Sequence, residues 1–213
     1  MKQLMAGLVL VSTGAAQATT VLSEGFDSLA GLPAAGWVLT NNSDSPNQPW
    51  FQGNSGIFPS FDGAAGAYAA ASFLSSGLDT GRVSNWLITP VVSLNGASTL
   101  SFYARTEITG FSDGLTVRLS PTGSSTTTDF SVTLLTLPAL NPAWTLYTVT
   151  LPNFASPTAA RVAFEYNVAS ALDADFIGLD TVSVVTSAVP EPASALLMGL
   201  GLAGFMIRRR LAA

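Results

Sequence analysis

Leu115-Thr116-Val117-Arg118-Leu119-Ser120 is the stretch of sequence that decides the fold. Its apolar side chains alternate with polar ones. In an extended backbone the two leucines and the valine therefore face one way, and the threonine, arginine and serine face the other. The same period of two recurs in residues 161–166 and 100–103. This alternation is typical of β-strands that bury one face and expose the other.

Further short apolar segments, separated by Gly, Pro, Asn and Asp, extend this pattern along the chain. We expect strands at residues 20–26, 36–40, 86–93, 130–136, 145–151 and 176–185. Sustained helical periodicity is absent from this region, and residues 41–85 should be mainly loop with one or two short strands. Many short strands separated by turn residues predict an all-β fold. We expect one domain over residues 19–189, a jelly-roll-like antiparallel β-sandwich.

The N-terminus predicts an export signal. Lys2 precedes an apolar run over residues 4–11, and Ala16-Gln17-Ala18 forms a small-x-small cleavage site before Thr19. One cation, a short apolar run and this ending are typical of a secretory signal peptide, and the run is too short to span a bilayer. We therefore expect residues 1–18 to be removed by cleavage between Ala18 and Thr19.

The C-terminus predicts a weak membrane segment over residues 190–213. Pro190-Glu191-Pro192 is followed by an apolar stretch, residues 193–207, and then by Arg208, Arg209 and Arg210. The apolar stretch is shorter than the roughly 20 helical residues that a bilayer core needs. Because arginines stay on the cytoplasmic side, the body of the protein should lie outside. The spacing alone leaves open whether this helix is a temporary anchor or a lasting one.

This order of parts resembles the PEP-CTERM sorting tail of Gram-negative bacteria. The resemblance implies that an exosortase in the inner membrane recognises the Pro-Glu-Pro site and releases the protein outward after transient anchoring through the C-terminal helix. It also implies a final location at the cell surface or in the extracellular matrix, and a link to exopolysaccharide and biofilm.

Composition excludes several classes of chemistry. The 213 residues include no cysteine and no histidine, so thiol nucleophiles, disulfides, the commonest general base and the commonest zinc ligand are missing. Residues 19–189 hold four arginines and twelve carboxylates, a formal net charge of −8. Nucleic acid and anionic membranes need a basic face on their partner, so both are excluded as partners.

Two patterns in the sequence contain residue types that can act in catalysis. Gly110-Phe111-Ser112-Asp113-Gly114 matches the G-x-S-x-G pattern of serine hydrolases. That pattern needs a base to take the serine proton, and neither histidine nor lysine is available in the body, so we interpret it as a turn before a strand. Carboxylates such as Glu107 and Asp180 leave a polysaccharide hydrolase or lyase as an alternative, since two carboxyl groups across a cleft can cleave a glycoside.

A second resemblance extends over the whole body of the chain. It is carried by Ser23-Glu24-Gly25-Phe26-Asp27, Leu32-Pro33-Ala34-Ala35-Gly36-Trp37, Asn85-Trp86-Leu87-Ile88-Thr89-Pro90, Asp113-Gly114-Leu115-Thr116-Val117, Ala163-Phe164-Glu165-Tyr166 and Phe176-Ile177-Gly178-Leu179-Asp180-Thr181-Val182, in this order. Together these segments resemble a choice-of-anchor J domain, which is similar to cleaved-adhesin domains and distantly to MAM domains. The resemblance implies a jelly-roll β-sandwich on a bacterial surface protein.

The same resemblance implies structural calcium, held by acids near the first strand and on the last one. On this sequence those residues are Glu24, Asp27 and Asp180. Carboxylate oxygens are the ligands that calcium prefers. The alternative is that Asp27 and Asp180 cap turns or face solvent.

Trp50 is the aromatic residue that we expect to contact a ligand. It lies among polar loop residues, in Asn47-Gln48-Pro49-Trp50, where an exposed ring could pack on a sugar. Trp37 and Trp86 are expected in the core. The overall prediction is an exported, non-enzymatic adhesion or carbohydrate-binding protein whose partner is exopolysaccharide. The carboxylate-based hydrolase or lyase and a purely structural surface-coat component are the alternatives.

Overall fold

The computed structural model describes residues 18–187, whose regular secondary structure is almost entirely β-strand. The strands are β1 (Ala18–Glu24), β2 (Val38–Asn41), β3 (Phe51–Gln52), β4 (Ala69–Ser72), β5 (Val83–Ile88), β6 (Val92–Thr106), β7 (Leu115–Ser120), β8 (Val132–Leu137), β9 (Thr145–Val168) and β10 (Phe176–Ser187). Four short 3-10 helices lie between them: η1 (Leu29–Gly31), η2 (Phe73–Ser75), η3 (Thr127–Asp129) and η4 (Ala171–Asp173).

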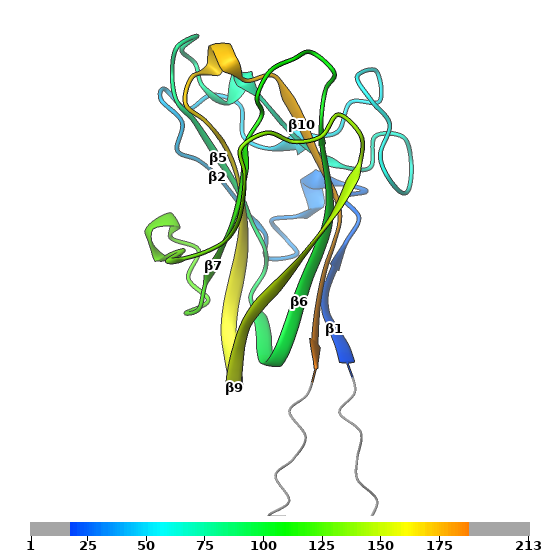
Figure 1. Cartoon of the computed structure of the whole chain (residues 1–213), viewed down its shortest axis with the longest axis vertical. Coiled ribbons are helices and arrows are strands. Elements are labelled where there is room, and N and C mark those ends of the chain that lie inside the picture. Colours follow the sequence, from blue (N-terminus) through cyan, green and yellow to red (C-terminus); the bar gives the residue numbers. More distant parts are fainter. Residues whose placement is uncertain (1–17, 188–213) are drawn as a thin grey trace, which may run out of the picture.

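The strands form two layers that are joined by β9 (Figure 1). The first half of β9 pairs with β6, and β6 pairs with β10, which also carries β1 and the β4–β3 pair. The second half of β9 lies between β5 and β7, and these pair further with β2 and β8. We call the layer that holds both chain ends, β1 and β10, the terminal sheet, and the other layer the middle sheet. All of these pairs are antiparallel.

The core lies between the two sheets and follows the alternation of the strands. In β6, Leu100 and Phe102 are fully buried, whereas their neighbour Ser101 is only half-buried on the outer face. Phe102 meets Phe164 of the second half of β9 edge to face, with ring centroids 5.1 Å apart. This contact between aromatic rings from opposite sheets therefore helps to hold the two layers together.

The predicted all-β, jelly-roll-like antiparallel sandwich is confirmed, and the predicted strand at residues 115–120 is β7 with the same bounds. Two boundaries were wrong. Residues 86–93 are interrupted, because β5 ends at Ile88 and β6 begins at Val92. Residues 145–151 and 161–166, predicted as separate strands, belong to one strand of 24 residues that continues through Pro152 and Pro157. Both prolines lie where β9 pairs only with β6, and an edge strand tolerates proline because one side of it lacks a partner.

The predicted signal peptide and the predicted C-terminal membrane helix lie outside the described residues. Between residues 18 and 187 no helix has the length and apolar character to cross a membrane. Ala18 and Thr19, the residues predicted to flank the cleavage site, are the first two of β1 and lie opposite Ser187 and Thr186 at the end of β10. The chain therefore enters and leaves the described fold at the same end of the sandwich (Figure 1).

An aromatic cluster covers part of the outer face of the terminal sheet. Phe58, Tyr68, Ala70 and Phe176 are its buried members, and Phe51, Ile57 and Trp144 pack against them. The guanidinium of Arg105 lies 4.1 Å from the centroid of the Phe58 ring, in a cation–π contact. Gly178 of β10 lies beneath the cluster, and a Cβ atom there would come within 2.8 Å of Trp144 and 2.9 Å of Phe58. Only glycine allows the rings to lie this close to the sheet.

We predict that Gly178→Ala destabilises the protein. The added methyl group would push the cluster off the sheet, which should lower the free energy of unfolding by about 1–3 kcal/mol. Urea unfolding followed by tryptophan fluorescence measures this. Gly25→Ala is the matched control, because a Cβ at Gly25 meets no atom within 4 Å and should change stability by less than about 0.5 kcal/mol. Equal stability of the two variants would contradict the close packing described here.

Candidate functional site

Loops at one end of the sandwich enclose a pocket of about 730 Å³. It is lined by Gly110, Phe111, Ser112 and Gly114 before β7, by residues 136–138 where β8 ends and 167–169 where β9 ends, and by Thr116 of β7 and Asp173 of η4. In Figure 1 the loop between β6 and β7 and the helix η4 lie at the top, whereas β1 begins and β10 ends at the bottom. The pocket therefore lies at the end of the sandwich opposite to the start of β1 and the end of β10.

Asp113 fixes the loop that forms one wall of the pocket. Its side chain is fully buried and accepts hydrogen bonds from the Tyr166 hydroxyl (2.5 Å), the Thr106 hydroxyl and the Asp175 backbone N–H (2.8 Å). Its backbone carbonyl accepts from the Leu140 N–H at 2.9 Å. Burial, followed by the charge of Asp113, raises the pKa of Tyr166 well above its usual value, which keeps the phenol protonated as a donor. Asp113 thus joins the loop to β6, β9 and the segment before β10.

The side chains that face the pocket combine one aromatic ring with several polar groups. Phe111 is 45% exposed, and Ser112, Thr136, Asn167 and Asp173 are also exposed. Hydroxyl and amide groups both donate and accept hydrogen bonds, a carboxylate accepts them, and a ring offers an apolar face. An arrangement of this kind suits a ligand with many hydroxyl groups and some apolar surface.

Ser112 lies in this pocket without a base to activate it. The chain contains no histidine, and the neighbouring carboxyl of Asp113 is buried in bonds to other groups. The segment leads into β7 and does not open a helix, as the nucleophile turn of serine hydrolases does. The interpretation of residues 110–114 as a turn before a strand agrees with this position.

Glu107 and Asp175 lie close to each other in the segments next to this loop. The Thr109 hydroxyl donates to the Asp175 carboxylate at 2.5 Å. Burial, followed by the charge of Asp175, raises the pKa of Glu107. A carboxyl with a raised pKa has one property of a general acid, so Glu107 is the residue to replace in any test for hydrolysis.

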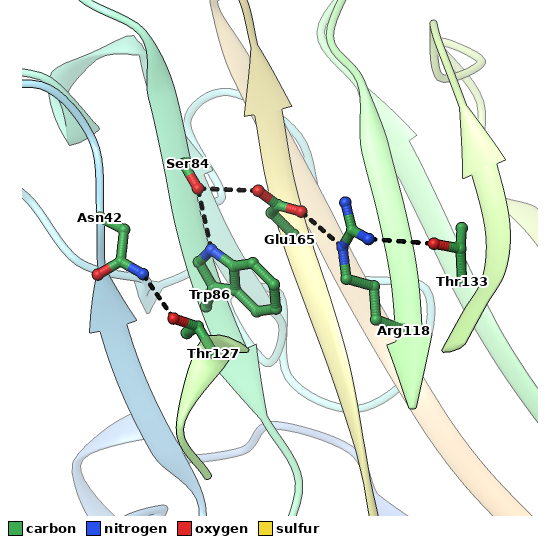
Figure 2. A network of polar contacts seen from close by, with 7 residues as sticks. All are labelled: Asn42, Ser84, Trp86, Arg118, Thr127, Thr133 and Glu165. Carbon is green, nitrogen blue, oxygen red and sulfur yellow. Dashed lines mark hydrogen bonds and ion pairs between the residues drawn. The ribbon is translucent and has the colours of Figure 1, made fainter. Parts of the chain in front are cut away.

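The buried carboxyl of Glu165, on the outer face of the middle sheet, is fully bonded to neighbouring side chains and has a structural role. Figure 2 shows Glu165, which is 4% exposed, accepting from the Ser84 hydroxyl at 2.8 Å and from Nε of Arg118 at 2.9 Å. The Trp86 indole N–H donates to the same Ser84 hydroxyl, and Arg118 also donates to Thr133. Both carboxylate oxygens are thus bonded to protein groups, as a buried carboxyl requires.

Two of the three predicted calcium ligands, Asp27 and Asp180, lie next to the loop at residues 60–67, and the third, Glu24, is the last residue of β1. Asp180 is fully buried and accepts from the backbone N–H groups of Phe61 (2.8 Å), Asp62 (3.2 Å) and Thr181 (2.6 Å). An Asp27 carboxylate oxygen would be 3.3 Å from a Cβ at Gly63 in the same loop. Glu24 accepts from the Phe26 N–H at 2.8 Å. Burial raises the pKa of Asp180, although the three N–H donors act in the opposite direction.

These acids lie on neighbouring segments, but the described part of the chain contains no group of three carboxylates positioned to hold a metal ion. Calcium binding by Glu24, Asp27 and Asp180 therefore stays a prediction.

The prediction that Trp50 is an exposed, ligand-stacking residue is wrong. Trp50 is only 2% exposed and belongs to the main core. Its indole N–H donates to the backbone carbonyl of Asn85 in β5 at 3.0 Å. Its polar sequence neighbours gave no sign of this burial, because the contact joins residues 35 positions apart. Trp37 is in the same core, as expected, whereas Trp86 packs with Phe130 in a smaller cluster on the middle sheet.

Sequence reasoning did not identify Asn167 as a pocket residue, nor the pairing of Asp113 with Tyr166. The sequence motifs that contain Asp113 do not indicate its partner, which is 53 residues away. The sequence did contain one indication of this pairing. Tyr166 lies in a stretch expected to be buried, and a buried tyrosine hydroxyl usually has a hydrogen-bond partner.

Comparison with protein families identifies two regions of the chain. The profile of the Cleaved Adhesin Domain family matches residues 19–184, which is most of the chain. The profile of the PEP-CTERM protein-sorting motif matches residues 188–210, which include Pro190, Glu191, Pro192 and Arg208, Arg209 and Arg210. Those six residues lie outside the part of the chain that the structure describes. A search of curated proteins returned no match.

Solved structures of similar fold include domains of Lys-gingipain from Porphyromonas gingivalis W83. The K1 cleaved adhesin domain is 25% identical, covers 78% of this chain and 97% of its own, and superposes with a TM-score of 0.62. The K3 cleaved adhesin domain is 24% identical, with 80% and 99% coverage and a TM-score of 0.58. The CBM22-1 xylan-binding domain of Xyn10C from Paenibacillus barcinonensis is 12% identical, with 83% and 99% coverage and a TM-score of 0.50.

We predict that Asp113→Asn destabilises the whole fold. The amide can no longer accept from all of its buried donors, so the free energy of unfolding should fall by about 2–4 kcal/mol. Thermal unfolding followed by circular dichroism measures the loss. Ser112→Ala is the matched control at the adjacent, exposed position and should change stability by less than about 0.5 kcal/mol. A stable Asp113→Asn variant would show that the pocket loop is held by other contacts.

Proposed function

The chain belongs to the Cleaved Adhesin Domain family, and from that premise we propose that it is an exported surface protein that binds carbohydrate through its loop-end pocket without catalysing a reaction. The narrower assignment to choice-of-anchor J domains and the role in an exopolysaccharide matrix are parts of this proposal. So is the division into a signal peptide at residues 1–18, a binding domain at 19–189 and a sorting tail at 190–213.

The observation that carries the proposal is the position of the pocket relative to the sorting motif. The sorting motif begins at residue 188, directly after β10 ends at Ser187, whereas the pocket lies at the opposite end of the sandwich. While the tail is held at a membrane, a pocket at the far end faces away from the anchor and stays accessible. An exosortase that cleaves at Pro190-Glu191-Pro192 would then release the domain outward with its pocket intact.

The chemistry of the pocket supports carbohydrate as the ligand class. Phe111 offers an exposed ring, and Asn167, Asp173 and Thr136 offer polar groups around it. A solved domain of similar fold binds xylan, but at 12% identity that likeness concerns the fold alone. The choice of carbohydrate as the ligand class therefore rests on the pocket residues of this chain.

Carbohydrate binding by the pocket can be measured with neutral oligosaccharides. We predict that Phe111→Ala weakens binding of a xylo- or gluco-oligosaccharide about tenfold, because a ring contact contributes about 0.5–1.5 kcal/mol beyond its buried area. Isothermal titration calorimetry on the purified chain gives the dissociation constants. Ile108→Ala is the matched control, since Ile108 is 78% exposed in the same loop and does not line the pocket.

Wild-type affinity in the Phe111→Ala variant would refute the assignment of the ligand to this pocket. Cleavage of the oligosaccharide by the wild-type chain, lost in a Glu107→Gln variant, would favour the hydrolase alternative over binding alone.

Export and release can be tested separately from ligand binding. Replacing Pro190, Glu191 and Pro192 with alanine should leave the chain in the membrane fraction, because the processing enzyme no longer recognises it. Cell fractionation followed by immunoblotting shows where the protein goes. The matched control replaces Ser187, the last residue of β10, with alanine and should be released normally. Normal release of the triple-alanine variant would contradict exosortase processing at this site.

A further inference from the structure

The outer face of the terminal sheet carries a regular array of hydroxyl groups. In β6, Leu100 and Phe102 point into the core, so Thr99 and Ser101 point outward. In β9, Val149 is buried between the exposed Thr148 and Thr150. Along β10 the array, at Ser183, lies between the aromatic cluster, at Phe176 and Gly178, and the end of the strand at Ser187.

The register of the strands aligns these side chains into two rows. Ser101 lies opposite Thr148 on one side and Ser183 on the other, and Ser183 lies opposite Ser23. In the second row Thr99 lies between Thr150 and Val185, and Val185 lies opposite Thr20. Neighbours within a row are about 4.7–4.9 Å apart and the rows about 6.8 Å apart, as strand geometry requires. We call these eight residues the hydroxyl ladder.

The hydroxyls of the ladder are free to bond a ligand. Within residues 18–187 none of these seven hydroxyls bonds to another protein group, whereas Ser98 and Thr186 on the opposite face bond to each other at 2.9 Å. Each hydroxyl can donate one hydrogen bond and accept others. The threonines are also restricted in χ1, so little side-chain freedom is lost when they bind.

The ladder carries no charge, although the body of the protein is strongly acidic. Its eight members are Ser, Thr and one Val, whereas residues 19–189 include twelve carboxylates. A charged polymer would therefore find no opposite charge among the ladder residues themselves. A second copy of the chain would bury little apolar surface here, since seven of the eight side chains are polar.

Apolar groups flank the ladder on the side of the loops. Tyr103 is the next outward residue of β6 and lies opposite Leu146, which is 51% exposed. Phe61, 44% exposed, stacks on Tyr103 with ring centroids 3.5 Å apart and planes 14° apart. An exposed ring and an exposed leucine beside rows of hydroxyls offer both contacts that a sugar chain uses, apolar packing and hydrogen bonds.

We propose that the hydroxyl ladder, with Phe61 and Leu146 at its edge, is a second binding face that takes an uncharged polysaccharide chain. The proposal rests on the proposed function, because it assumes that the ligand class is carbohydrate. It adds a surface distinct from the loop-end pocket and restricts the ligand of that surface to neutral polymers. One chain could then hold a short sugar segment in its pocket and a polymer against its sheet.

The experiment measures co-sedimentation of the full chain, in mild detergent, with insoluble cellulose and insoluble xylan at low and high salt. Thr99→Val combined with Thr148→Val removes two hydroxyls and keeps side-chain shape and β-propensity. We expect binding to the polymer to weaken about tenfold or more, since each lost hydrogen bond weakens binding about threefold to tenfold. Salt should leave binding nearly unchanged, because screening acts on charged contacts.

The controls separate this proposal from the pocket. Thr40→Val changes a half-buried threonine on the middle sheet and should bind polymer like the wild type. The Thr99→Val/Thr148→Val variant should still bind soluble oligosaccharide in the calorimeter. Circular dichroism and thermal unfolding verify that both variants fold.

Four results would overturn the ladder as a polysaccharide face. One is wild-type polymer binding by the Thr99→Val/Thr148→Val variant while Phe111→Ala abolishes it, which leaves the pocket as the binding site and the proposed function intact. Another is loss of polymer binding at high salt. The third is a concentration-dependent dimer of the wild-type chain that the double variant loses, which would assign the face to a second copy. A wild-type chain that binds neither polymer nor oligosaccharide refutes the proposed function together with the ladder.

Discussion

The rest of the structure depends on the alternation of inward-facing and outward-facing side chains along β9. This strand of 24 residues belongs to both sheets, and irregular pairing with β6 between Leu151 and Thr158 separates the half in the terminal sheet from the half in the middle sheet. The alternation of buried and exposed side chains within each half decides which of them enter the core. Phe164 meets Phe102 across the core, and Tyr166 reaches Asp113 beneath the pocket loop. Thr148 and Thr150 face outward on the terminal sheet. A shift by one residue within either half would reverse the side chains of that half.

Buried carboxyl groups in this protein are held by hydrogen bonds more than by opposite charges. Asp113 is held by two hydroxyls and an N–H, and Asp180 by three backbone N–H groups, whereas Glu165 also pairs with Arg118. Because burial raises the pKa of Asp180, the native state favours its protonated form. The contribution of Asp180 to stability therefore decreases as the pH rises from the ordinary aspartate range through that raised pKa, and is constant above it.

Sequence patterns predicted the fold better than the candidate site, because strand alternation is local whereas the site depends on contacts between distant segments. Alternation is local, so β7 was predicted with its bounds. Residues 145–151 and 161–166 were predicted as separate strands, but they form one strand, because proline at positions 152 and 157 is tolerated where one side of β9 lacks a partner. Trp50 was misplaced because its partner, the Asn85 carbonyl, comes from a distant strand. The hydroxyl ladder depends on the register between β1, β6, β9 and β10, which are far apart in the sequence. The period of two along each strand shows which side chains face outward, but it does not show which residues of different strands lie opposite each other.

The central claim is that carbohydrate binds at the loop end of the sandwich, away from the sorting tail. Titration of the isotopically labelled chain with a neutral oligosaccharide, followed by amide chemical shifts in nuclear magnetic resonance spectra, tests it most directly. Binding in the pocket predicts saturable shifts at Phe111, Asn167 and Asp173 and none at Arg161, which pairs with the last residue of β7 at the opposite end of the middle sheet. Shifts confined to the residues around Arg161, or no saturable shift at any concentration, would contradict it.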